Sequence, residues 1–289
     1  MDSGREQTPM VEPIAIVDIG CGSQLRMLSI GDDIVAETYR TSGSRAFEPA
    51  SLMVWFELAK LSTYAIDIGA FTGIYSLVAA GANQLIKVAA IEPSKTAFSR
   101  LCLNIQINRF QAQIAPLNVA AGERFGDCLL NHYDGIYCLN SGATLLEAGH
   151  RPFFYSEPAR LIPLDILPAI AACDRRFTVI ELPQLGPDII KIDVEGHEVA
   201  VLAGMRHEIH RSLPIFIIEC LSPTALQAVQ DSLAEFSYHP LLIDDENMVL
   251  IGDILEYRVR TTRNVMFYPD SKQSVIDQIH ENSGLASRR

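Results

Sequence analysis

The sequence has no long hydrophobic run, no basic excess and no paired cysteines, and each absence excludes a class of protein. No apolar stretch approaches the ~18 residues of a membrane span, and the first dozen residues lack the basic start and apolar core of a secretory signal. Lys and Arg total 23 against 35 Asp and Glu, and a formal net charge of -12 disfavours nucleic acid as a partner. The six cysteines form no C-x-x-C pair of the zinc or redox type. We therefore expect a cytoplasmic protein with no membrane or nucleic-acid partner.

The 289 residues, 48% hydrophobic and 20% charged, have the composition of a globular protein with one large or two modest domains. From about Ala65 onward, apolar runs alternate with helical stripes, which predicts an α/β fold with a mostly parallel sheet covered by helices on both faces. Three runs near the end lack a long helix between them, so they predict antiparallel pairing. The expected strands are Ala65–Gly69, Val88–Glu92, Ile114–Val119, Ile189–Val194, Ile215–Glu219, Leu241–Ile243, Val249–Ile251 and Val265–Phe267.

The chain divides into three parts: a tail and hairpin extension over residues 1–50, a main domain over 51–269, and a flexible tail over 270–289. The hairpin is expected to turn at Gly31-Asp32-Asp33, because the sequence alternates on both sides of that turn. An insert over residues 123–186 interrupts the strand and helix rhythm, and connections that long are usually functional. We expect it to cover an acceptor pocket, with loop tips around Gly142 and Gly149 that a protease cuts in the free protein and that cofactor plus acceptor protect.

The strongest local motif is AIDIGAFTGIYSL, in which a strand ends at Asp67 and a turn with Gly69 and Gly73 leads directly into a helix. Glycines allow a ligand close to the backbone, and the helix start offers free amide groups. Glu92 ends the next strand, 19 residues after Gly73, near the spacing at which an acid meets a ribose. This arrangement predicts a site for an adenosine-containing cofactor.

Charge narrows the choice of cofactor. The spacing is G-x-x-x-G rather than the triple-glycine fingerprint, and Asp67 would lie beside the pyrophosphate of a dinucleotide. S-adenosylmethionine instead offers an ammonium and a sulfonium group there, which suit a carboxylate. Two alternatives remain, a nicotinamide-dependent oxidoreductase and a non-catalytic module that keeps the cofactor pocket.

The second strong motif is PDIIKIDVEGHE. Along an extended strand Lys191, Asp193 and Glu195 share one face, at the carboxyl end of a buried strand where open α/β sheets bind ligands. A structural ion pair between Lys191 and an acid is the alternative.

Together DIGAFTG, IEPS, NIQIN, KIDVEGHE, VLAG and IIEC resemble the FkbM family of S-adenosylmethionine-dependent methyltransferases, over most of the chain from about Phe47 to Tyr268. The resemblance implies a class I methyltransferase (Rossmann-like) fold with a seven-stranded sheet whose last strand is antiparallel. It also implies methyl transfer to a hydroxyl oxygen of a small-molecule or glycan acceptor, typically a polyketide-like natural product.

The resemblance also implies roles for single residues. Asp67, Gly69 and Gly73 would line the methionine end of the cofactor, Glu92 the ribose, and Asn118 and Ala120 the adenine. Phe71 stands where the family often has Asn, which removes one polar contact. Asp165 occupies a position that we interpret as structural. The full expected cofactor set is Asp67, Gly69, Ala70, Phe71, Gly73, Glu92, Pro93, Asn118, Ala120 and Asp193.

Methyl transfer requires the enzyme to align the nucleophile, remove its proton and exclude water. The expected catalytic residues are Asp193, Glu195 and Lys191, with either acid as the base and His197 behind them. We assign no metal ligands, although an ion bound by Asp193 and Glu195 is an alternative to the base. His207 and His210 lie one helical turn apart, and a solvated helix face explains them.

Overall fold

The computed structural model describes residues 12–22, 24–135, 137, 139, 142–146, 152–173, 183 and 186–288. The N-terminal tail over residues 1–11, Cys138, Gly149 and Arg289 lie outside these ranges. Within them, none of the helices combines the length and the apolar character that crossing a bilayer requires.

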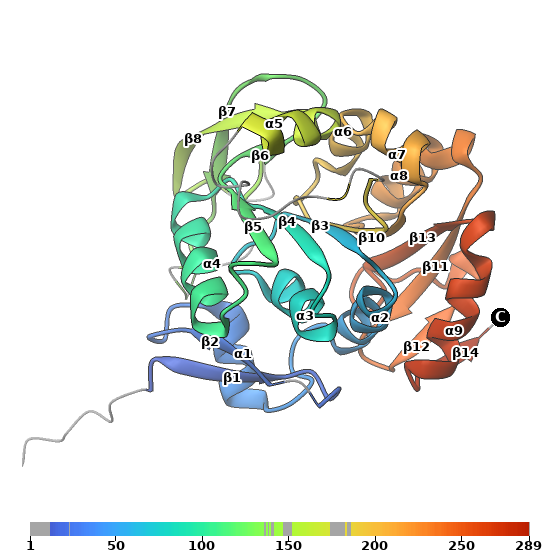
Figure 1. Cartoon of the computed structure of the whole chain (residues 1–289), viewed down its shortest axis with the longest axis horizontal. Coiled ribbons are helices and arrows are strands. Elements are labelled where there is room, and N and C mark those ends of the chain that lie inside the picture. Colours follow the sequence, from blue (N-terminus) through green and yellow to red (C-terminus); the bar gives the residue numbers. More distant parts are fainter. Residues whose placement is uncertain are drawn as a thin grey trace, which may run out of the picture.

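A nine-stranded sheet forms the centre of the molecule (Figure 1). Its strand order is β14-β12-β11-β13-β10-β9-β3-β4-β5. The bounds are β3 (Tyr64–Ile68), β4 (Lys87–Ile91), β5 (Ile114–Leu117), β9 (Ile189–Ile192), β10 (Ile215–Glu219), β11 (Tyr238–Asp244), β12 (Val249–Ile251), β13 (Asn264–Pro269) and β14 (Ala286–Arg288). Strands β5, β4, β3, β9 and β10 are parallel, and β13 pairs antiparallel with both β10 and β11.

The seven strands from β5 to β11 in this order give the class I methyltransferase arrangement, with β13 antiparallel as expected. The expected count of seven strands in the sheet is wrong, because β12 pairs with β11 and β14 pairs with β12 beyond that edge. From β3 the chain proceeds through β4 to β5 on one side, and then crosses to β9 and β10 on the other. This reversal opens a crevice at the carboxyl ends of β3 and β9, where ligands bind in open α/β sheets.

Helices cover both faces of the sheet (Figure 1). One face packs against α2 (Pro49–Lys60), α3 (Ile74–Ala82), α4 (Lys95–Asn108) and α9 (Gln273–Asn282), and the other against α6 (Glu198–Ala203), α7 (Arg206–Ser212) and α8 (Pro223–Leu233). Two helices begin where the sequence places a cap: the Ser94 hydroxyl accepts from the Ala97 amide, and that of Ser222 accepts from Ala225.

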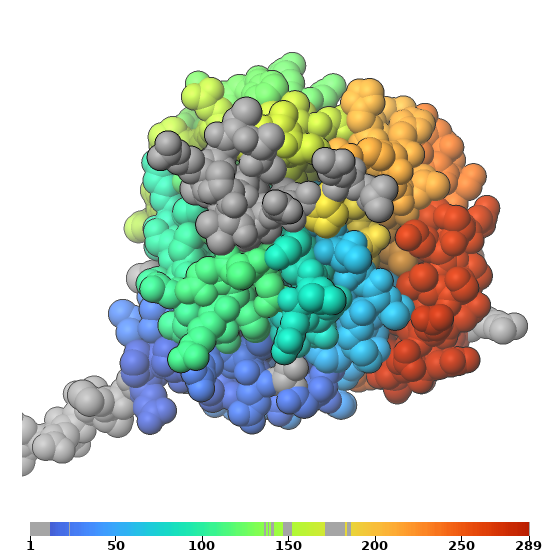
Figure 2. Space-filling model, in the orientation of Figure 1, coloured from blue at the N-terminus to red at the C-terminus, as the bar shows by residue number. Residues whose placement is uncertain are grey.

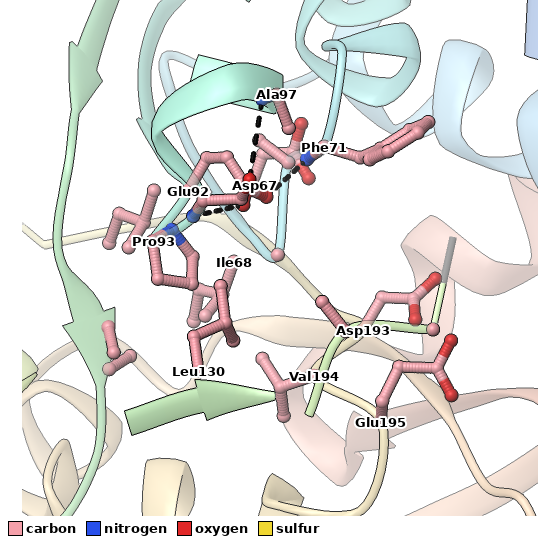
Figure 3. Close-up of a pocket in the computed structure, with 18 of the residues that line it drawn as sticks. Asp67, Ile68, Phe71, Glu92, Pro93, Ala97, Leu130, Asp193, Val194 and Glu195 are labelled. Carbon is pink, nitrogen blue, oxygen red and sulfur yellow. Dashed lines mark hydrogen bonds between the residues drawn. The ribbon is translucent and has the colours of Figure 1, made fainter. Parts of the chain in front are cut away.

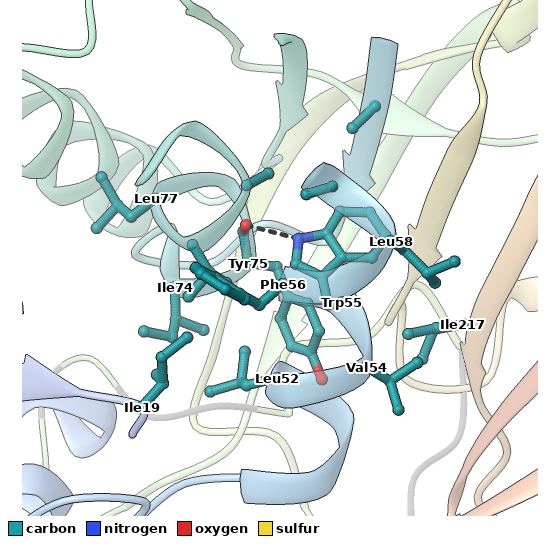
Figure 4. Packing of buried hydrophobic residues seen from close by; sticks show 14 of the residues in the cluster. Ile19, Leu52, Val54, Trp55, Phe56, Leu58, Ile74, Tyr75, Leu77 and Ile217 are labelled. Carbon is teal, nitrogen blue, oxygen red and sulfur yellow. Dashed lines mark hydrogen bonds between the residues drawn. The ribbon is translucent and has the colours of Figure 1, made fainter. Parts of the chain in front are cut away.

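The core between α2 and α3 centres on Trp55, which is fully buried (Figure 4). Its indole Nε1 donates a hydrogen bond to the Tyr75 carbonyl at 2.8 Å, and the two rings meet edge to face at 5.7 Å. The single tryptophan thus buries a large apolar surface with its one polar atom satisfied, and it fixes α2 against α3.

The N-terminal extension corrects one expectation. The hairpin exists, since β1 (Ile14–Asp18) pairs antiparallel with β2 (Gln24–Leu28), but the chain reverses between Asp18 and Gln24 and not at Gly31-Asp32-Asp33. The segment after that tripeptide is a helix, α1 (Ile34–Ser42). Asp33 explains the difference, because its carboxylate accepts from the amides of Val35 and Ala36 and caps the helix.

The C-terminal residues are also not the flexible tail expected over 270–289. Helix α9 contacts α2 and buries Ile276 and Ile279, and β14 extends the sheet. The residues coloured red lie packed on the surface of the molecule in the space-filling view (Figure 2). The physical reason is a helical stripe of apolar residues in this segment, which supplies enough buried surface to hold it.

The insert contributes β7 (Gly126–His132) and β8 (Tyr155–Ile162) to a separate three-stranded sheet of order β6-β8-β7. Strand β6 (Ala120–Ala121) directly precedes the insert, and α5 (Leu167–Cys173) follows β8. Among the contacts that join the insert to the main body, Leu139 exchanges backbone hydrogen bonds with Asp32 and Ile34, and the Thr144 hydroxyl donates to the Glu195 carbonyl at 2.8 Å.

Candidate active site

A pocket lies in the crevice at the carboxyl ends of β3, β4 and β9. Two sets of residues face each other across it (Figure 3). We call Asp67, Phe71 and Glu92, with the turn that carries them, the β3–β4 wall, and Lys191, Asp193 and Glu195 the β9 wall. The insert contributes Leu130, His132, Leu139, Gly142, Ala143, Leu145 and Tyr155 to the lining.

The turn after β3 requires glycine at Gly69. The residue has φ +79°, and a Cβ there would lie 1.7 Å from the Asp193 carbonyl oxygen. The segment that follows β9 and carries Asp193 therefore packs directly on this turn, which links the two walls. The amides of Gly69 and Ala70 both donate to the Ile91 carbonyl at 2.9 Å. Gly73 does not line the pocket, and a Cβ there would meet the Leu101 side chain at 2.5 Å, so its role is packing against α4.

In the described part of the chain, every hydrogen bond to the Glu92 carboxylate comes from a backbone amide. Its Oε2 accepts from the Phe71 amide at 2.8 Å and its Oε1 from the Ser94 amide at 2.7 Å (Figure 3). The residue is 6% exposed, and this burial raises the pKa of its carboxyl to about 7. Each oxygen retains a second lone pair, so the fixed carboxylate can accept further hydrogen bonds from a ligand.

Asp67 lies deeper, with 1% of its surface exposed. Its Oδ2 accepts from the Ser76 amide at 2.9 Å and the Ser76 hydroxyl at 2.6 Å. Burial raises the pKa of Asp67 to about 6, against the opposing effect of Ser76 and of the Lys191 charge. Asp67 therefore ties the first turn of α3 to β3 while it lines the pocket.

On the β9 wall, Lys191 is 1% exposed and lies in a polar cage. Its Nζ is 3.1 Å from Asp193 Oδ2 and 3.1 Å from Asn264 Oδ1, and 5.0 Å from the centre of the Tyr75 ring. Burial raises the pKa of the Asp193 carboxyl, but Lys191 and a hydrogen bond with Glu219 outweigh it and the net shift is downward. The predicted clustering of Lys191 with an acid is thus present as an ion pair.

Glu195 has a different environment from Asp193. Its backbone has φ +53°, and its Oε1 lies 3.6 Å from where a Cβ on Gly142 would stand. Burial, reinforced by the Asp193 charge, raises the pKa of Glu195 to about 7. Gly142 is half-buried near this carboxylate.

Several predicted residues lie away from the pocket lining. Asn118 is behind it, where its amide nitrogen donates to the carbonyls of Glu92 and Pro93 at 2.9 Å and holds the turn that follows β4. The His197 Nε2 is buried near Gly122, on the side of the insert sheet. Asp165 accepts from the Glu208 amide at the start of α7. Ala70, Pro93 and Ala120 line the pocket, and His207 and His210 are exposed.

Behind the β9 wall lie three charged residues that the sequence reasoning missed. Glu219 ends β10 and its Oε1 is 3.1 Å from Arg263 Nε, while Arg263 is also 3.4 Å from Glu48 Oε1. Glu219 had a usable signal, because it ends a buried parallel strand as Glu92 does. Glu48 and Arg263 precede α2 and β13 in segments without any motif, and only the fold brings them together.

A sequence model described as the methyltransferase FkbM domain matches residues 67–240, which include both walls. The chain belongs to the FkbM methyltransferase family. The FkbM assignment favours a methyltransferase over the oxidoreductase alternative, and it agrees with the strand order of the sheet.

Individual relatives of this FkbM protein are distant. Methyltransferase sdnD from Sordaria araneosa is 22% identical over 199 residues, which span 62% of this chain and 75% of that protein. The solved structure of methyltransferase FkbM from Methylobacillus flagellatus is 17% identical with a TM-score of 0.47, covering 72% of this chain and 43% of that one. The O-methyltransferase TomG from Streptomyces achromogenes is 10% identical with a TM-score of 0.44, covering 81% and 86%. This chain thus spans less than half of the Methylobacillus protein.

Proposed function

We propose that this protein transfers a methyl group from S-adenosylmethionine to a hydroxyl oxygen of a small acceptor, either a glycan or a polyketide-like natural product. The observation that carries the proposal is the opposition of the two walls across one pocket. One wall offers fixed carboxylates for hydroxyl and cationic groups, and the other offers a carboxylate suited to proton transfer. The cytoplasmic location expected from the sequence is part of this proposal.

The residues of the β3–β4 wall fit the cofactor chemically. Glu92 would accept hydrogen bonds from the two ribose hydroxyls with lone pairs that Phe71 and Ser94 leave open. Asp67 and the Gly69 turn would hold the cationic methionine end. Ala97 and Ala120 would contact the adenine, since both line the apolar part of the pocket. When bound, S-adenosylmethionine supplies an electrophilic methyl group on a sulfonium.

Of the two candidate bases, we favour Glu195. A general base works best with a pKa near the operating pH, and the carboxyl of Glu195 has a pKa of about 7. Asp193 is paired with Lys191 at 3.1 Å, which stabilises its charged form and weakens it as a proton acceptor. We assign Lys191 the role of positioning Asp193, and Glu195 the role of removing the hydroxyl proton.

The acceptor would enter between the β9 wall and the insert. His132 and Tyr155 stack at 4.2 Å between ring centres and line the pocket, and His132 Nε2 is 3.0 Å from Glu157 Oε1. These aromatic rings offer a flat surface to a sugar or a polyketide ring. The insert thereby excludes water from the reacting hydroxyl.

The test is transfer of an isotope-labelled methyl group to a panel of glycans and polyketide alcohols, with amine and thiol analogues in parallel. The proposal predicts label on oxygen, stable to mild base, and transfer by a Glu195→Gln variant that is slower by roughly 10²- to 10⁴-fold. Label only on nitrogen or sulfur acceptors would refute O-methylation. Tight cofactor binding without transfer to any acceptor class would favour the non-catalytic alternative.

A further inference from the structure

Three carboxylates from distant parts of the chain converge behind the β9 wall. Glu48 precedes α2, Asp193 follows β9 and Glu219 ends β10. One oxygen from each lies within 4.8 Å of the other two. Asp193 belongs both to this cluster and to the pocket lining, so the cluster borders the space assigned to the acceptor.

The cluster carries more negative than positive charge. Lys191 and Arg263 are the cations in contact with its three carboxylates, at 3.1 to 3.4 Å. The cluster therefore has three carboxylates against two cations. Excess buried charge is costly, so the site must take up either protons or a cation.

One oxygen of the cluster lacks a donor. Glu219 is 3% exposed and Arg263 engages its Oε1, but its Oε2 is buried with no hydrogen-bond partner among the described residues. Buried carboxylate oxygens without a partner are rare, and each requires an explanation. One carboxylate oxygen of Glu219 lies within 4.8 Å of one of Asp193. The orphaned atom therefore belongs to the group that faces Asp193.

From this geometry we propose that Glu48, Asp193 and Glu219 bind a hard divalent cation. Two oxygens on opposite sides of Ca²⁺ at ~2.4 Å are ~4.8 Å apart, and ~4.2 Å apart around Mg²⁺ or Mn²⁺. The three oxygens, all within 4.8 Å of one another, are close enough together to contact one ion of either size. A set of three carboxylates selects Mg²⁺, Mn²⁺ or Ca²⁺ rather than a thiophilic metal. This triad differs from the alternative pair of Asp193 and Glu195 considered from the sequence, and it leaves Glu195 free to act as a base.

The chemical role of the ion rests on the function proposed above, whereas its binding does not. An ion held by Asp193 at the pocket wall would bind the acceptor hydroxyl and lower its pKa, which helps Glu195 to take the proton. The site is therefore tested by ion binding in the absence of cofactor and acceptor.

The experiment is Mn²⁺ titration of the full chain, followed by calorimetry and by electron paramagnetic resonance of the free ion. The proposal predicts one saturable Mn²⁺ per chain, displaced by Mg²⁺ or Ca²⁺. Glu219→Gln and Glu48→Gln should each weaken binding at least about tenfold. Glu208→Gln is the matched control, because Glu208 is a buried glutamate paired with Arg211 outside the cluster, and it should bind as the wild type does.

Absence of saturable Mn²⁺ binding at millimolar concentration would overturn the proposal and assign the excess charge to protons. Equal binding by wild type and both cluster variants would also overturn it, because the ion would then lie on surface acids. If Glu219→Gln does not fold, Mn²⁺ binding by Glu48→Gln is the test, because Glu48 lies outside the central sheet. A chain that binds Mn²⁺ through these residues but transfers no methyl group would refute the proposed function and leave the ion site standing.

Discussion

The two walls of the pocket use the same type of side chain in opposite electrostatic settings. On the β3–β4 wall, Glu92 accepts from backbone amides and Asp67 from Ser76, and the pKa values of both carboxyls are raised. On the β9 wall, Asp193 is paired with buried Lys191 and its pKa is lowered. On the β3–β4 wall, local hydrogen bonds hold the carboxylates in place for binding a ligand. On the β9 wall, the ion pair of Lys191 with Asp193 balances charge beside the acceptor hydroxyl, which must lose a proton.

The largest expected effect is that of Glu195→Gln on turnover. Removal of a general base should lower turnover by roughly 10²- to 10⁴-fold while the affinity for S-adenosylhomocysteine stays the same. The measurement is steady-state transfer to an acceptor found with the labelled panel, with calorimetry beside it. Glu123→Gln removes the same charge from an exposed position and should leave turnover unchanged. Normal turnover in the folded Glu195→Gln variant would remove Glu195 from catalysis.

The next largest effect is the loss of folding stability when the ion pair of the β9 wall is broken. Lys191→Met leaves Asp193 without its ion-pair partner. Because the Asp193 side chain is only 27% exposed, its unpaired charge should lower the free energy of unfolding by about 3 to 5 kcal/mol. Lys60→Met breaks the helix-surface pair with Glu57, in which Lys60 is 44% exposed, and should cost less than about 1 kcal/mol. Urea unfolding at neutral pH measures both. Similar small losses would show that the Lys191 pair does not organise the β9 wall.

A smaller effect concerns pH and the β3–β4 wall. The carboxyl of Glu92 has a pKa of about 7 in the folded chain against an ordinary 4.5, so between these values the folded state holds a proton that the unfolded state has lost. Stability should therefore decrease as pH rises through this window, by up to about 1.4 kcal/mol per pH unit from this group. Glu92→Gln should show a flatter curve in urea unfolding between pH 5 and pH 7. Parallel curves for wild type and variant would place the Glu92 pKa near its ordinary value.

Much of the fold follows from local sequence. Five parallel strands, the Ser94 and Ser222 caps and the Gly69 turn all have signals within a dozen residues, and the structure confirms them. The C-terminal helix was missed because its stripe is short and strand β14 is polar and exposed, so its pairing with β12 depends on the fold. The helix after Asp33 was missed because a capping Asp and a turn Asp look alike in sequence.

The site was only partly predictable, because some of its residues are brought together by the fold and belong to no local motif. Asp67, Glu92 and Asp193 end strands within recognisable motifs, and the structure brings them to one pocket. Neither Arg263 nor Glu48 belongs to a motif, and their ion pair joins positions more than 200 residues apart. Gly73 and Asn118 were expected to line the pocket but support it from behind. Spacing along one strand reveals a shared face, but it does not show which oxygen remains unpaired after folding.

The central claim is that Glu92 anchors an adenosine-containing methyl donor, and calorimetry with S-adenosylhomocysteine tests it most directly. Loss of charge-assisted hydrogen bonds worth roughly 1.5 to 3 kcal/mol predicts a ten- to hundredfold rise in the dissociation constant of Glu92→Gln, with no binding of NAD by the wild type. Glu57→Gln, a buried glutamate of α2 outside the pocket, should bind as the wild type does. Unchanged S-adenosylhomocysteine binding by folded Glu92→Gln, or tight binding of NAD, would contradict the account.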